Sequence, residues 1–435
     1  MLCSRPPSYL LSTFSSYGIR PAKRRCLSSQ KRSIPQPPYK ILFFGADKFS
    51  CVTLETLYAA RKDLIEHLVV VTPPDQRTGR KLKEVHRPPL RLLAESLSIP
   101  SISLPSTLLK DWRPPPEFLP SSPSLPPLPY SLLLTASFGH LLPTSLLSQF
   151  QPLNALNLHP SILPNYRGAA PIQWGIINGD SDSNWKEDQD KGMGITVQEL
   201  SREKFDRGRI LANQKIVVPE NSDFLTLEPI LAKKGGELLI KILKDLPTYQ
   251  ENSKPQDSTK VTSAPKLKKQ TSKIDWNRSS SIEITRLQRG VGHQYPLWTI
   301  LPHLSASSSK SSSPTQEQEQ EQQQQQLQLI LSPIPLKLSF SNLPLNPSTP
   351  PPAGSIFYNP LDKSIYITTK PTENPTSTQV EGEEVEREGI EVVKVEKVKK
   401  EGGKWIDSRD WWNGINKRSK KSESMDSSQG WIRLE

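Results

Sequence analysis

Short apolar runs alternate with amphipathic stretches along the first half of the chain. Residues 39–46 read Tyr-Lys-Ile-Leu-Phe-Phe-Gly-Ala, and an apolar run that ends in glycine predicts a buried strand. Helical patterns follow over 50–60 and 89–97. Further strands are predicted at 68–72, around Ile102, at 132–136 and at 156–158. Because strands alternate with helices, we predict an α/β fold, with a Rossmann-like, mostly parallel sheet and helices on both faces.

The second half of the chain has a different pattern. Short strand-like segments recur there, at 327–330, 335–340, 354–358, 364–368 and 389–398. Such a series is typical of a small β-barrel. We therefore predict a C-terminal β-barrel domain of OB-like type, an assignment that rests on fold analogy.

The composition of the chain suggests limits for these domains. We predict a transit peptide over 1–36, the α/β domain over 37–247, a linker over 248–264, where apolar periodicity is lost, and the β-barrel domain over 265–435. Inside the barrel domain, residues 304–328 are Ser-rich and then Gln/Glu-rich. This low-complexity insert is expected to be disordered.

Three other segments interrupt the pattern and are expected to be loops. Residues 113–130 contain eight prolines, which neither a helix nor a central strand accommodates. Residues 180–192 are almost entirely polar, and residues 370–388 lack periodicity. The first two fall between predicted elements of the α/β domain, so they should leave its core intact.

The charge of the chain is concentrated at its start. The net charge is +12, and residues 1–40 contain eight basic residues, eight serines and no acidic residue. This composition is typical of a mitochondrial transit peptide, which predicts the mitochondrial matrix as destination; an ordinary disordered basic tail is the alternative. No apolar run approaches the roughly 18 residues that a membrane span needs, so no membrane partner is expected.

Cysteines and histidines give no sign of a metal. The three cysteines, Cys3, Cys26 and Cys51, exclude a disulfide scaffold and a cysteine-based zinc site. The six histidines show no ligand spacing, so we predict no metal. The motif Gly-x-Gly-x-x-Gly is also absent after the first predicted strand, which removes support for a dinucleotide cofactor.

The candidate chemistry is concentrated in residues 157–173. Asn157 and His159 are two residues apart, and this spacing on a strand places both side chains on one face. Ligand sites of open α/β sheets lie at the carboxyl ends of such strands. Taken alone, however, a histidine near a strand end is also compatible with a purely structural role.

The whole segment resembles the signature of the folate-dependent formyltransferases, most closely of those that act on methionyl-tRNA. It reads Asn157-Leu-His159-Pro-Ser161-Ile-Leu-Pro164-Asn-Tyr-Arg167-Gly-Ala-Ala-Pro-Ile-Gln173. The segments 136–143 and 204–211 also resemble that family, and the match covers about residues 39–245. Beyond this the resemblance is weaker.

The resemblance implies that Asn157, His159 and Asp206 form the catalytic set. Formyl transfer between two nitrogens passes through a tetrahedral oxyanion, which an amide N–H from Asn157 would stabilise. His159 would stabilise the same oxyanion or move protons, and Asp206 would orient the imidazole. For Asp206 alone, a solvated loop carboxylate is the alternative.

The resemblance further implies that the co-substrate is 10-formyltetrahydrofolate. The residues expected to contact it are Ser161, Ile162, Leu163 and Pro164. For this turn a purely structural role is an alternative, and both roles are compatible. For Arg167 a structural ion pair and a substrate contact remain equally open.

A basic loop supplies the candidate nucleic-acid contacts. The resemblance implies that it enters the acceptor stem of an initiator tRNA, and its basic residues are Arg77, Arg80, Lys81 and Lys83. Such side chains provide affinity through phosphates, without sequence choice. The alternative is an ordinary solvated charged loop. A second basic cluster at 266–273 is compatible with a tRNA contact or with a basic linker.

The resemblance therefore implies formylation of the methionine α-amine on initiator methionyl-tRNA, and the transit-like composition of the first residues places it in mitochondrial translation initiation. The expected partners are that tRNA and folate, with a monomeric chain. Two alternatives remain: a folate-dependent formyltransferase or hydrolase with a small acceptor, and a non-catalytic RNA-binding protein on the same fold. The basic loop and second domain argue against the first, and the three candidate catalytic residues against the second.

Overall fold

The computed structural model describes residues 37–78, 80–105, 109, 112–182, 192–201, 204–301, 325–331, 336–339, 351–359, 362–371, 389–400, 402–419 and 432–433. The predicted transit peptide lies outside these ranges, as do most of the polar loop at 180–192, most of the low-complexity insert and most of the loop at 370–388.

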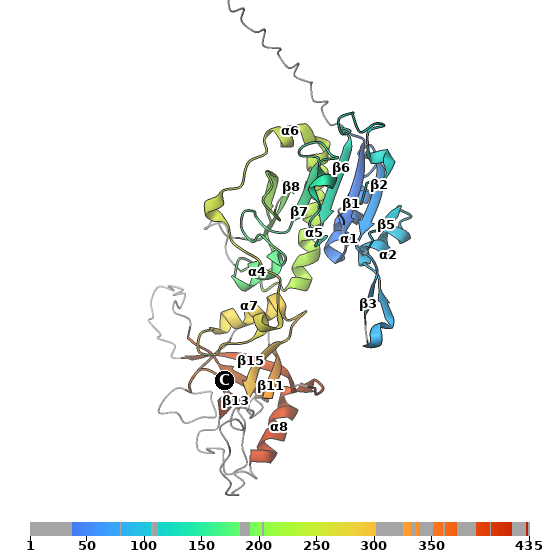
Figure 1. Ribbon diagram of the computed structural model, residues 1–435. Helices are drawn as coiled ribbons and strands as arrows, with labels where there is room; N and C mark the ends of the chain where they lie inside the picture. The colour runs from blue at the N-terminus through green and yellow to red at the C-terminus, as the bar shows by residue number, and fades with distance from the viewer. Residues whose placement is uncertain are drawn as a thin grey trace, which may run out of the picture. The chain divides into compact units, whose positions relative to one another are not determined.

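A seven-stranded sheet organises the N-terminal half of the described chain (Figure 1). Its order is β5-β2-β1-β6-β7-β8-β9. The strands are β1 Tyr39–Gly45, β2 Ile65–Thr72, β5 Ser101–Ser103, β6 Ser131–Ala136, β7 Ala155–His159, β8 Gly194–Glu199 and β9 Ile210–Lys215. Pairing is parallel from β5 to β7, whereas β8 and β9 pair antiparallel. The predicted mostly parallel sheet is confirmed.

The apolar run of β1 is continuous because both faces of the sheet are covered. Ile41 and Phe43 point into one core, which contains buried residues of α1 Lys48–Ala59, α2 Pro89–Ser96 and α5 Phe224–Lys244. Leu42 and Phe44 point into the opposite core, with residues of the 3₁₀ turn η3 Pro116–Phe118 and of α3 Thr144–Leu147. Alternation along a strand sends neighbours to opposite faces, so a segment buried on both faces, here residues 41–44, is apolar at every position. The Pro-rich segment, predicted as a loop, thus contributes the buried Phe118 to this second core.

Helix α5 approaches the sheet and α1 closely. A Cβ placed on Gly235 would lie 2.5 Å from a methyl carbon of Leu158 in β7, and one on Gly236 would lie 2.6 Å from Thr56 in α1. Two consecutive glycines therefore set how closely α5 packs.

None of the described helices has the length and apolar content that a bilayer crossing requires.

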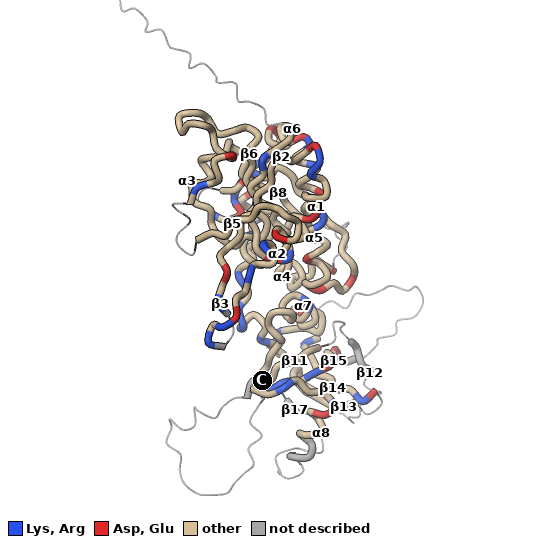
Figure 2. Tube along the Cα trace, turned by 90° about the vertical axis from the view of Figure 1, so that its right-hand side faces the viewer, with Lys and Arg blue, Asp and Glu red and all other residues tan. Residues whose placement is uncertain are grey.

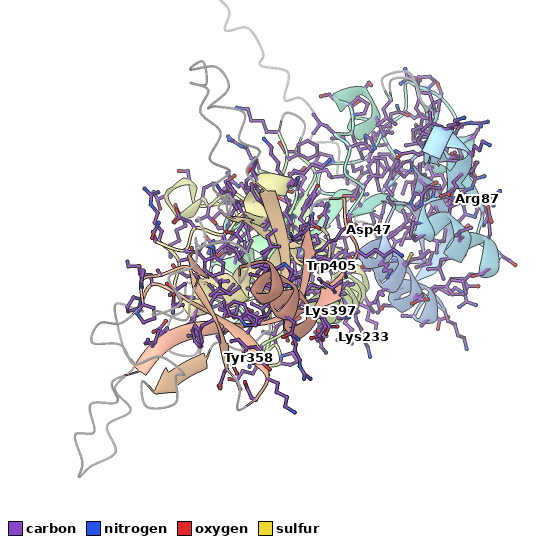
Figure 3. All side chains as sticks on the ribbon, turned by 90° about the horizontal axis from the view of Figure 1, so that it is seen from below. Asp47, Arg87, Lys233, Tyr358, Lys397 and Trp405 are labelled. Atoms are coloured by element: carbon purple, nitrogen blue, oxygen red, sulfur yellow. The ribbon has the colours of Figure 1, made fainter. Side chains whose placement is uncertain are left out.

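The C-terminal half of the described chain contains a separate antiparallel sheet, ordered β10-β11-β15-β14-β13-β17. These strands are β10 Leu297–Leu301, β11 Gln325–Leu331, β15 Gly389–Lys400, β14 Ser364–Thr368, β13 Ser355–Asn359 and β17 Ile432–Arg433. β12 Leu336–Ser339 and β16 Ile406–Asp407 also pair with β15. Figure 3 labels Lys397 on β15 and Trp405 just before β16. The predicted change from a mostly parallel sheet to a separate antiparallel β region is confirmed.

Two helices and one corrected boundary complete this half. α7 Ser281–Val291 starts with a capping box between Ser280 and Glu283, and α8 Ser408–Ser419 packs Trp411 and Trp412 into the core. The low-complexity insert was expected to reach residue 328, but β11 already begins at Gln325 and pairs with β10 and β15. Leu327 and Leu329 are buried, and this apolar alternation outweighs the glutamine-rich composition.

The segment predicted as a linker, 248–264, is firmly attached to the α/β domain. It begins inside α6 Leu246–Glu251. Further on, Thr262 and Ala264 pair with Arg167 through backbone hydrogen bonds of 2.7–3.1 Å that extend to Ala170. We call residues 253–264 the strap. Polar groups of the strap form hydrogen bonds with the α/β domain, so the strap is not a free connection between two domains.

Candidate active site

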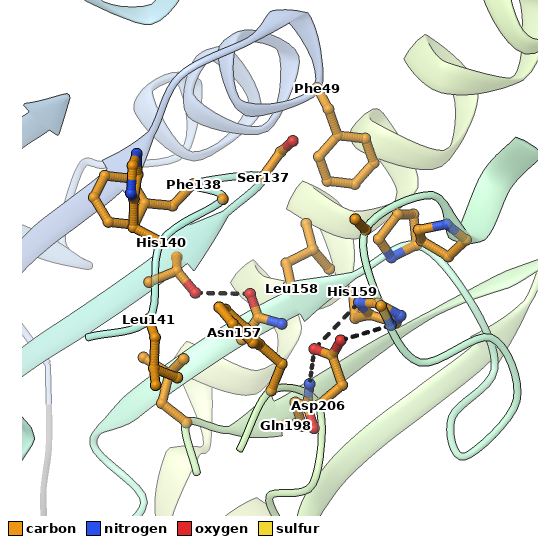
Figure 4. Close-up of a pocket in the computed structure, with 18 of the residues that line it drawn as sticks. Phe49, Ser137, Phe138, His140, Leu141, Asn157, Leu158, His159, Gln198 and Asp206 are labelled. Carbon is orange, nitrogen blue, oxygen red and sulfur yellow. Dashed lines mark hydrogen bonds and ion pairs between the residues drawn. The ribbon is translucent and has the colours of Figure 1, made fainter. Parts of the chain in front are cut away.

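A pocket of about 370 Å³ opens at the carboxyl ends of β6 and β7 (Figure 4). Its walls come from the β1–α1 turn, from segments within 135–142, 157–160 and 168–173, from residues 198–201 and 204–206, and from the start of α5. This is the position at which open α/β sheets bind ligands. Its volume is in the ordinary range for small-ligand sites.

Asn157 and His159 both face this pocket, as their two-residue spacing predicts. The Thr135 hydroxyl donates to Asn157 Oδ1 over 2.7 Å. That bond fixes the amide so that its nitrogen lies on the side of His159 and Asp206 (Figure 4). The amide is thus presented to the pocket as a hydrogen-bond donor.

His159 is 5% exposed and has a partner on each ring nitrogen. Its Nε2 lies 3.0 Å from the carbonyl oxygen of Tyr166. A carbonyl only accepts, so Nε2 carries a hydrogen. Nδ1 lies 3.5 Å from Oδ1 of Asp206. A second proton on Nδ1 would therefore make an imidazolium that faces a carboxylate, an arrangement suited to proton transfer.

Asp206 is brought to His159 from a loop between β8 and β9. Gln198 Nε2 donates to its Oδ1 over 3.0 Å, and the backbone N–H of Gly168 donates to its Oδ2 over 3.0 Å. The backbone φ of Asp206 is +54°, which lies in the left-handed region that residues other than glycine seldom adopt. The surrounding hydrogen bonds hold the carboxylate in this orientation. Asn157, His159 and Asp206, predicted from two places in the sequence, thus meet around one pocket.

Gln256 of the strap holds the Asp206 loop, and sequence reasoning missed it. Its Nε2 donates to Gln198 Oε1 at 3.0 Å, to the Asp206 carbonyl at 3.0 Å and to the Gly208 carbonyl at 2.9 Å. Its Oε1 accepts from Arg167 Nε at 3.0 Å and from the Arg167 Nη2 at 2.6 Å. These contacts of Arg167 are hydrogen bonds to a neutral amide, so they decide neither the ion pair nor the substrate contact predicted for it. No local pattern pointed to Gln256, because all its partners lie about 50 residues or more upstream.

The opposite side of the pocket is acidic, and it too was missed. Figure 4 places Ser137 and Phe49 on one side of the pocket and Gln198 and Asp206 on the other. Asp47, the N-cap of α1, accepts from the Ser50 backbone N–H over 3.2 Å and from the Ser137 hydroxyl. Asp47 is labelled at the start of α1 in Figure 3. Burial raises its pKa. Burial also raises the pKa of Glu228 to about 7, with the charge of Asp47 as a second cause.

The four residues predicted to contact folate form a turn beside the pocket. Ser161 Oγ donates to the Asn165 carbonyl over 2.7 Å. The Thr196 hydroxyl on β8 donates to the Ser161 carbonyl over 2.7 Å and accepts from the Leu163 backbone N–H over 3.0 Å. The pocket wall itself includes Pro160, whereas Ser161, Ile162, Leu163 and Pro164 are not part of it. Their contact with folate stays a prediction.

The basic loop is the tip of a two-stranded hairpin, β3 Gln76–Thr78 and β4 Glu84–His86, joined through the 3₁₀ turn η1 Arg80–Leu82. Lysine and arginine gather at this tip in Figure 2. Arg77, Lys81 and Lys83 are exposed, and Arg80 lies in η1, with its side chain outside the described part. Leu82 and Val85 are each 58% exposed beside them. The hairpin does not line the pocket, so it is a separate surface.

The second basic cluster lies beside an aromatic ring. Lys269 and Lys273 place their Nζ atoms 5.8 and 5.6 Å from the ring centre of Trp298 in β10. Trp298 is itself buried, and its Nε1 donates to the Lys269 carbonyl over 3.0 Å. Among the residues that the structure describes, no group of three or more His, Cys, Asp or Glu is placed to hold a metal ion.

Comparison with known proteins identifies the class. Residues 39–243 match the family model described as formyl transferase. This range contains the whole seven-stranded sheet and all three of Asn157, His159 and Asp206, so this part of the chain is a formyl transferase domain.

The relatives refine this class. The mitochondrial methionyl-tRNA formyltransferase of Bos taurus is 35% identical over 269 residues, which cover 61% of this chain and 60% of that protein. The methionyl-tRNA formyltransferase of Syntrophus aciditrophicus is 33% identical over 261 residues, 60% of this chain and 75% of that protein. The chain belongs to the methionyl-tRNA formyltransferase family. It spans about 60% of the length of the mitochondrial relatives it matches. A solved sugar 3N-formyl transferase aligns at a TM-score of 0.44 with 14% identity, over 82% of this chain and 97% of that chain.

Proposed function

We propose that this protein transfers the formyl group of 10-formyltetrahydrofolate to the α-amine of methionine on initiator methionyl-tRNA, in the mitochondrial matrix. The observation that carries the proposal is the convergence of Asn157, His159 and Asp206 on one pocket in a chain of this family. The proposal takes residues 1–36 as a mitochondrial presequence. The mitochondrial names of several relatives support the location.

The reaction needs an electrophile, a neutral amine and a proton route. The amine lone pair attacks the formyl carbon, a C–N bond forms, and the carbonyl π electrons move to oxygen. The amide N–H of Asn157 donates to that oxyanion. The C–N10 bond then breaks, and the folate nitrogen leaves with a proton. His159 carries this proton from the attacking nitrogen to N10, and Asp206 keeps the imidazole oriented.

The turn of Ser161, Ile162, Leu163 and Pro164 is proposed as the folate contact. It follows directly on Pro160, which belongs to the pocket wall. The Thr196 hydroxyl forms hydrogen bonds with two of its backbone groups, the Ser161 carbonyl and the Leu163 N–H. A turn held in this way offers a rigid edge to a flat pterin ring, and rigid edges limit the ordering cost of binding.

The hairpin and the second basic cluster are proposed as the tRNA contacts. The tip of the hairpin exposes Arg77, Lys81 and Lys83, and Arg80 belongs to the same proposal. The apolar Leu82 and Val85 next to them are suited to contacts with sugar or base surfaces. A surface of this kind supplies affinity that falls steeply with salt.

The test is formylation by the full chain. The protein is incubated with 10-formyltetrahydrofolate and initiator methionyl-tRNA, and formyl-methionine on the tRNA is measured. We expect formylation of this tRNA and none of uncharged tRNA or free methionine. Tight tRNA binding without formylation would instead support the RNA-binding alternative. Formylation of a small amine alone would support the small-acceptor alternative. A fusion of residues 1–36 to a fluorescent protein tests the location.

A further inference from the structure

The acidic side of the pocket contains a buried carboxylate that has no hydrogen-bond or ion-pair partner among the described residues. Among the polar groups that line the pocket, Asn157 is held by Thr135, His159 by Tyr166 and Asp206, and Asp47 by Ser50 and Ser137. Glu228 also lines the pocket and is only 9% exposed. Within the described residues its carboxylate makes neither a hydrogen bond nor an ion pair. A buried carboxylate without a donor is costly, so this position suits a group that arrives with the substrate.

Helix geometry directs Glu228 to the pocket. Phe224 and Glu228 are four residues apart on α5, which places them on one face of the helix, and both belong to the pocket wall. Gly235 and Gly236 hold the same helix close to β7 and α1. The carboxylate is therefore presented by a fixed element and not by a mobile loop.

The charges around Glu228 favour a cation or a proton there. In the β1–α1 turn, the negative charge of Asp47 raises the pKa of Glu228. At the start of α1, the positive charge of Lys48 lowers that pKa by a smaller amount. From α1, Cys51 is neutral, since burial raises its thiol pKa to about 12. After α7, His293 stacks on Phe224 with ring centres 4.1 Å apart, and burial lowers its pKa, so it is uncharged near neutrality.

We propose that Glu228, with Asp47 behind it, binds the α-ammonium of the acceptor and accepts its first proton. This inference rests on the proposed function and names the amine subsite of the same pocket. It also supplies what the chemistry above requires, because an ammonium has no lone pair with which to attack.

With Glu228 as the first proton acceptor, every proton in the formyl transfer is accounted for. The acceptor begins as R–NH₃⁺ and ends as R–NH–CHO, so its nitrogen loses two protons. The first moves to the Glu228 carboxylate and leaves the lone pair on nitrogen. The second moves through His159 to N10 of the folate as the C–N10 bond breaks. Glu228 then releases its proton to solvent, so each turnover releases one proton overall.

A binding experiment tests the subsite without any turnover. Initiator methionyl-tRNA is compared, without folate, with the same tRNA whose methionine α-amine has been replaced by a hydroxyl group. We expect the full chain to bind the amine form about tenfold more tightly, the value of one charge-assisted hydrogen bond. Glu228→Gln should remove this preference, and Glu237→Gln, an exposed residue on the same helix, should keep it. Equal binding of both tRNAs by the unmodified protein would overturn the inference.

A kinetic experiment separates this inference from the proposed function. The kcat/KM of the full chain should rise with pH through about 7, where the Glu228 carboxyl ionises. Glu228→Gln should lower kcat/KM about 100-fold. Its kcat/KM should rise only where the acceptor α-amine itself loses its proton, at an ordinary pKa of about 7.7–8.0. If the unmodified protein formylates methionyl-tRNA and the variant keeps the same pH profile, the function stands and the Glu228 assignment is wrong. If the amine preference is present but no formylation occurs, the subsite stands and the proposed function fails. Glu228→Met is a second variant, because an apolar side chain of similar length needs no partner.

Discussion

The two sides of the pocket differ in how their polar groups are satisfied. On one side, Asp206 has donors on both oxygens and His159 a partner on each ring nitrogen. On the other side, Glu228 is buried beside a second acid and has no hydrogen-bond or ion-pair partner in the described part of the chain. The first arrangement fixes groups before the substrate arrives, as charge stabilisation in a transition state requires. The second leaves the Glu228 carboxylate free to bind a cation that arrives with the substrate. The comparison suggests that orientation and recognition are assigned to opposite walls.

The largest expected effect is on the hydrogen-bonded side. Asn157→Ala removes the proposed oxyanion donor and should lower kcat about 100–1000-fold. Single-turnover formylation measures the loss, and the Kd for methionyl-tRNA should stay unchanged, because the amide does not contact the tRNA body. Gln149→Ala, a half-buried amide in the short turn after α3 that does not line the pocket, is the control. Near-normal turnover in Asn157→Ala would remove this residue from the catalytic set.

A smaller loss is expected when the support behind Asp206 is removed. Gln256→Leu breaks the hydrogen bonds to Gln198, to the Asp206 carbonyl and to Arg167, so the carboxylate is less well oriented. We expect kcat to fall about 10–100-fold with little change in KM, as for the misplacement of a catalytic group. Gln256→Glu keeps the acceptor for Arg167 but not the donors. If it restores activity, the donors to the Asp206 loop are unimportant.

The hairpin should respond in affinity and salt dependence, not in chemistry. Lys81→Ala and Lys83→Ala together should weaken tRNA binding and flatten the plot of log K against log salt by up to about 2 units. The kcat at saturating tRNA should stay the same. Lys233→Ala and Lys234→Ala on α5 remove the same charge elsewhere. An equal slope change in that control would show that overall charge, and not the hairpin, attracts the tRNA.

The smallest effect concerns stability on the acidic side. The pKa of Glu228 is raised to about 7 in the folded chain, so the folded state binds more protons than the unfolded state between its ordinary pKa and 7. Stability due to this group therefore falls as pH rises through that window, and the loss is complete above it. Glu228→Gln should raise Tm at pH 8 by a few degrees and by less at pH 5. Thermal unfolding followed by circular dichroism measures the difference. A variant that is less stable at pH 8 would mean that Glu228 has a structural partner.

The sequence predicted the hydrogen-bonded side better than the acidic side, for physical reasons. Asn157 and His159 share a strand, and a period of two is visible in the chain itself. Asp206 is more distant, and it was found through a family motif. Gln256 and Glu228 have neither signal, because their roles depend on packing between segments remote in the chain. An isolated glutamine in a strap and a glutamate on an amphipathic helix look like ordinary surface residues.

The fold shows the same division. The continuous apolar run at residues 41–44 indicated a strand that is buried on both faces, and such strands are typical of parallel sheets. The hairpin was visible only as a cluster of charge, since its strands are three residues each. The strap was predicted as a linker because it lacks apolar periodicity, yet its backbone and Gln256 are bonded to the α/β domain. Polar contacts of this kind leave no periodic trace.

The paired glycines of α5 have a consequence for anyone who engineers this protein. Replacing a helical glycine with alanine is a standard route to a more stable protein, with a usual gain of about 0.5–1 kcal/mol. Here the added methyl groups would meet Leu158 and Thr56 at 2.5 and 2.6 Å. The helix would have to move outward, and Glu228 would move with it. A substitution chosen to strengthen the scaffold would thus alter the geometry of the pocket, although neither glycine contributes a side chain to it.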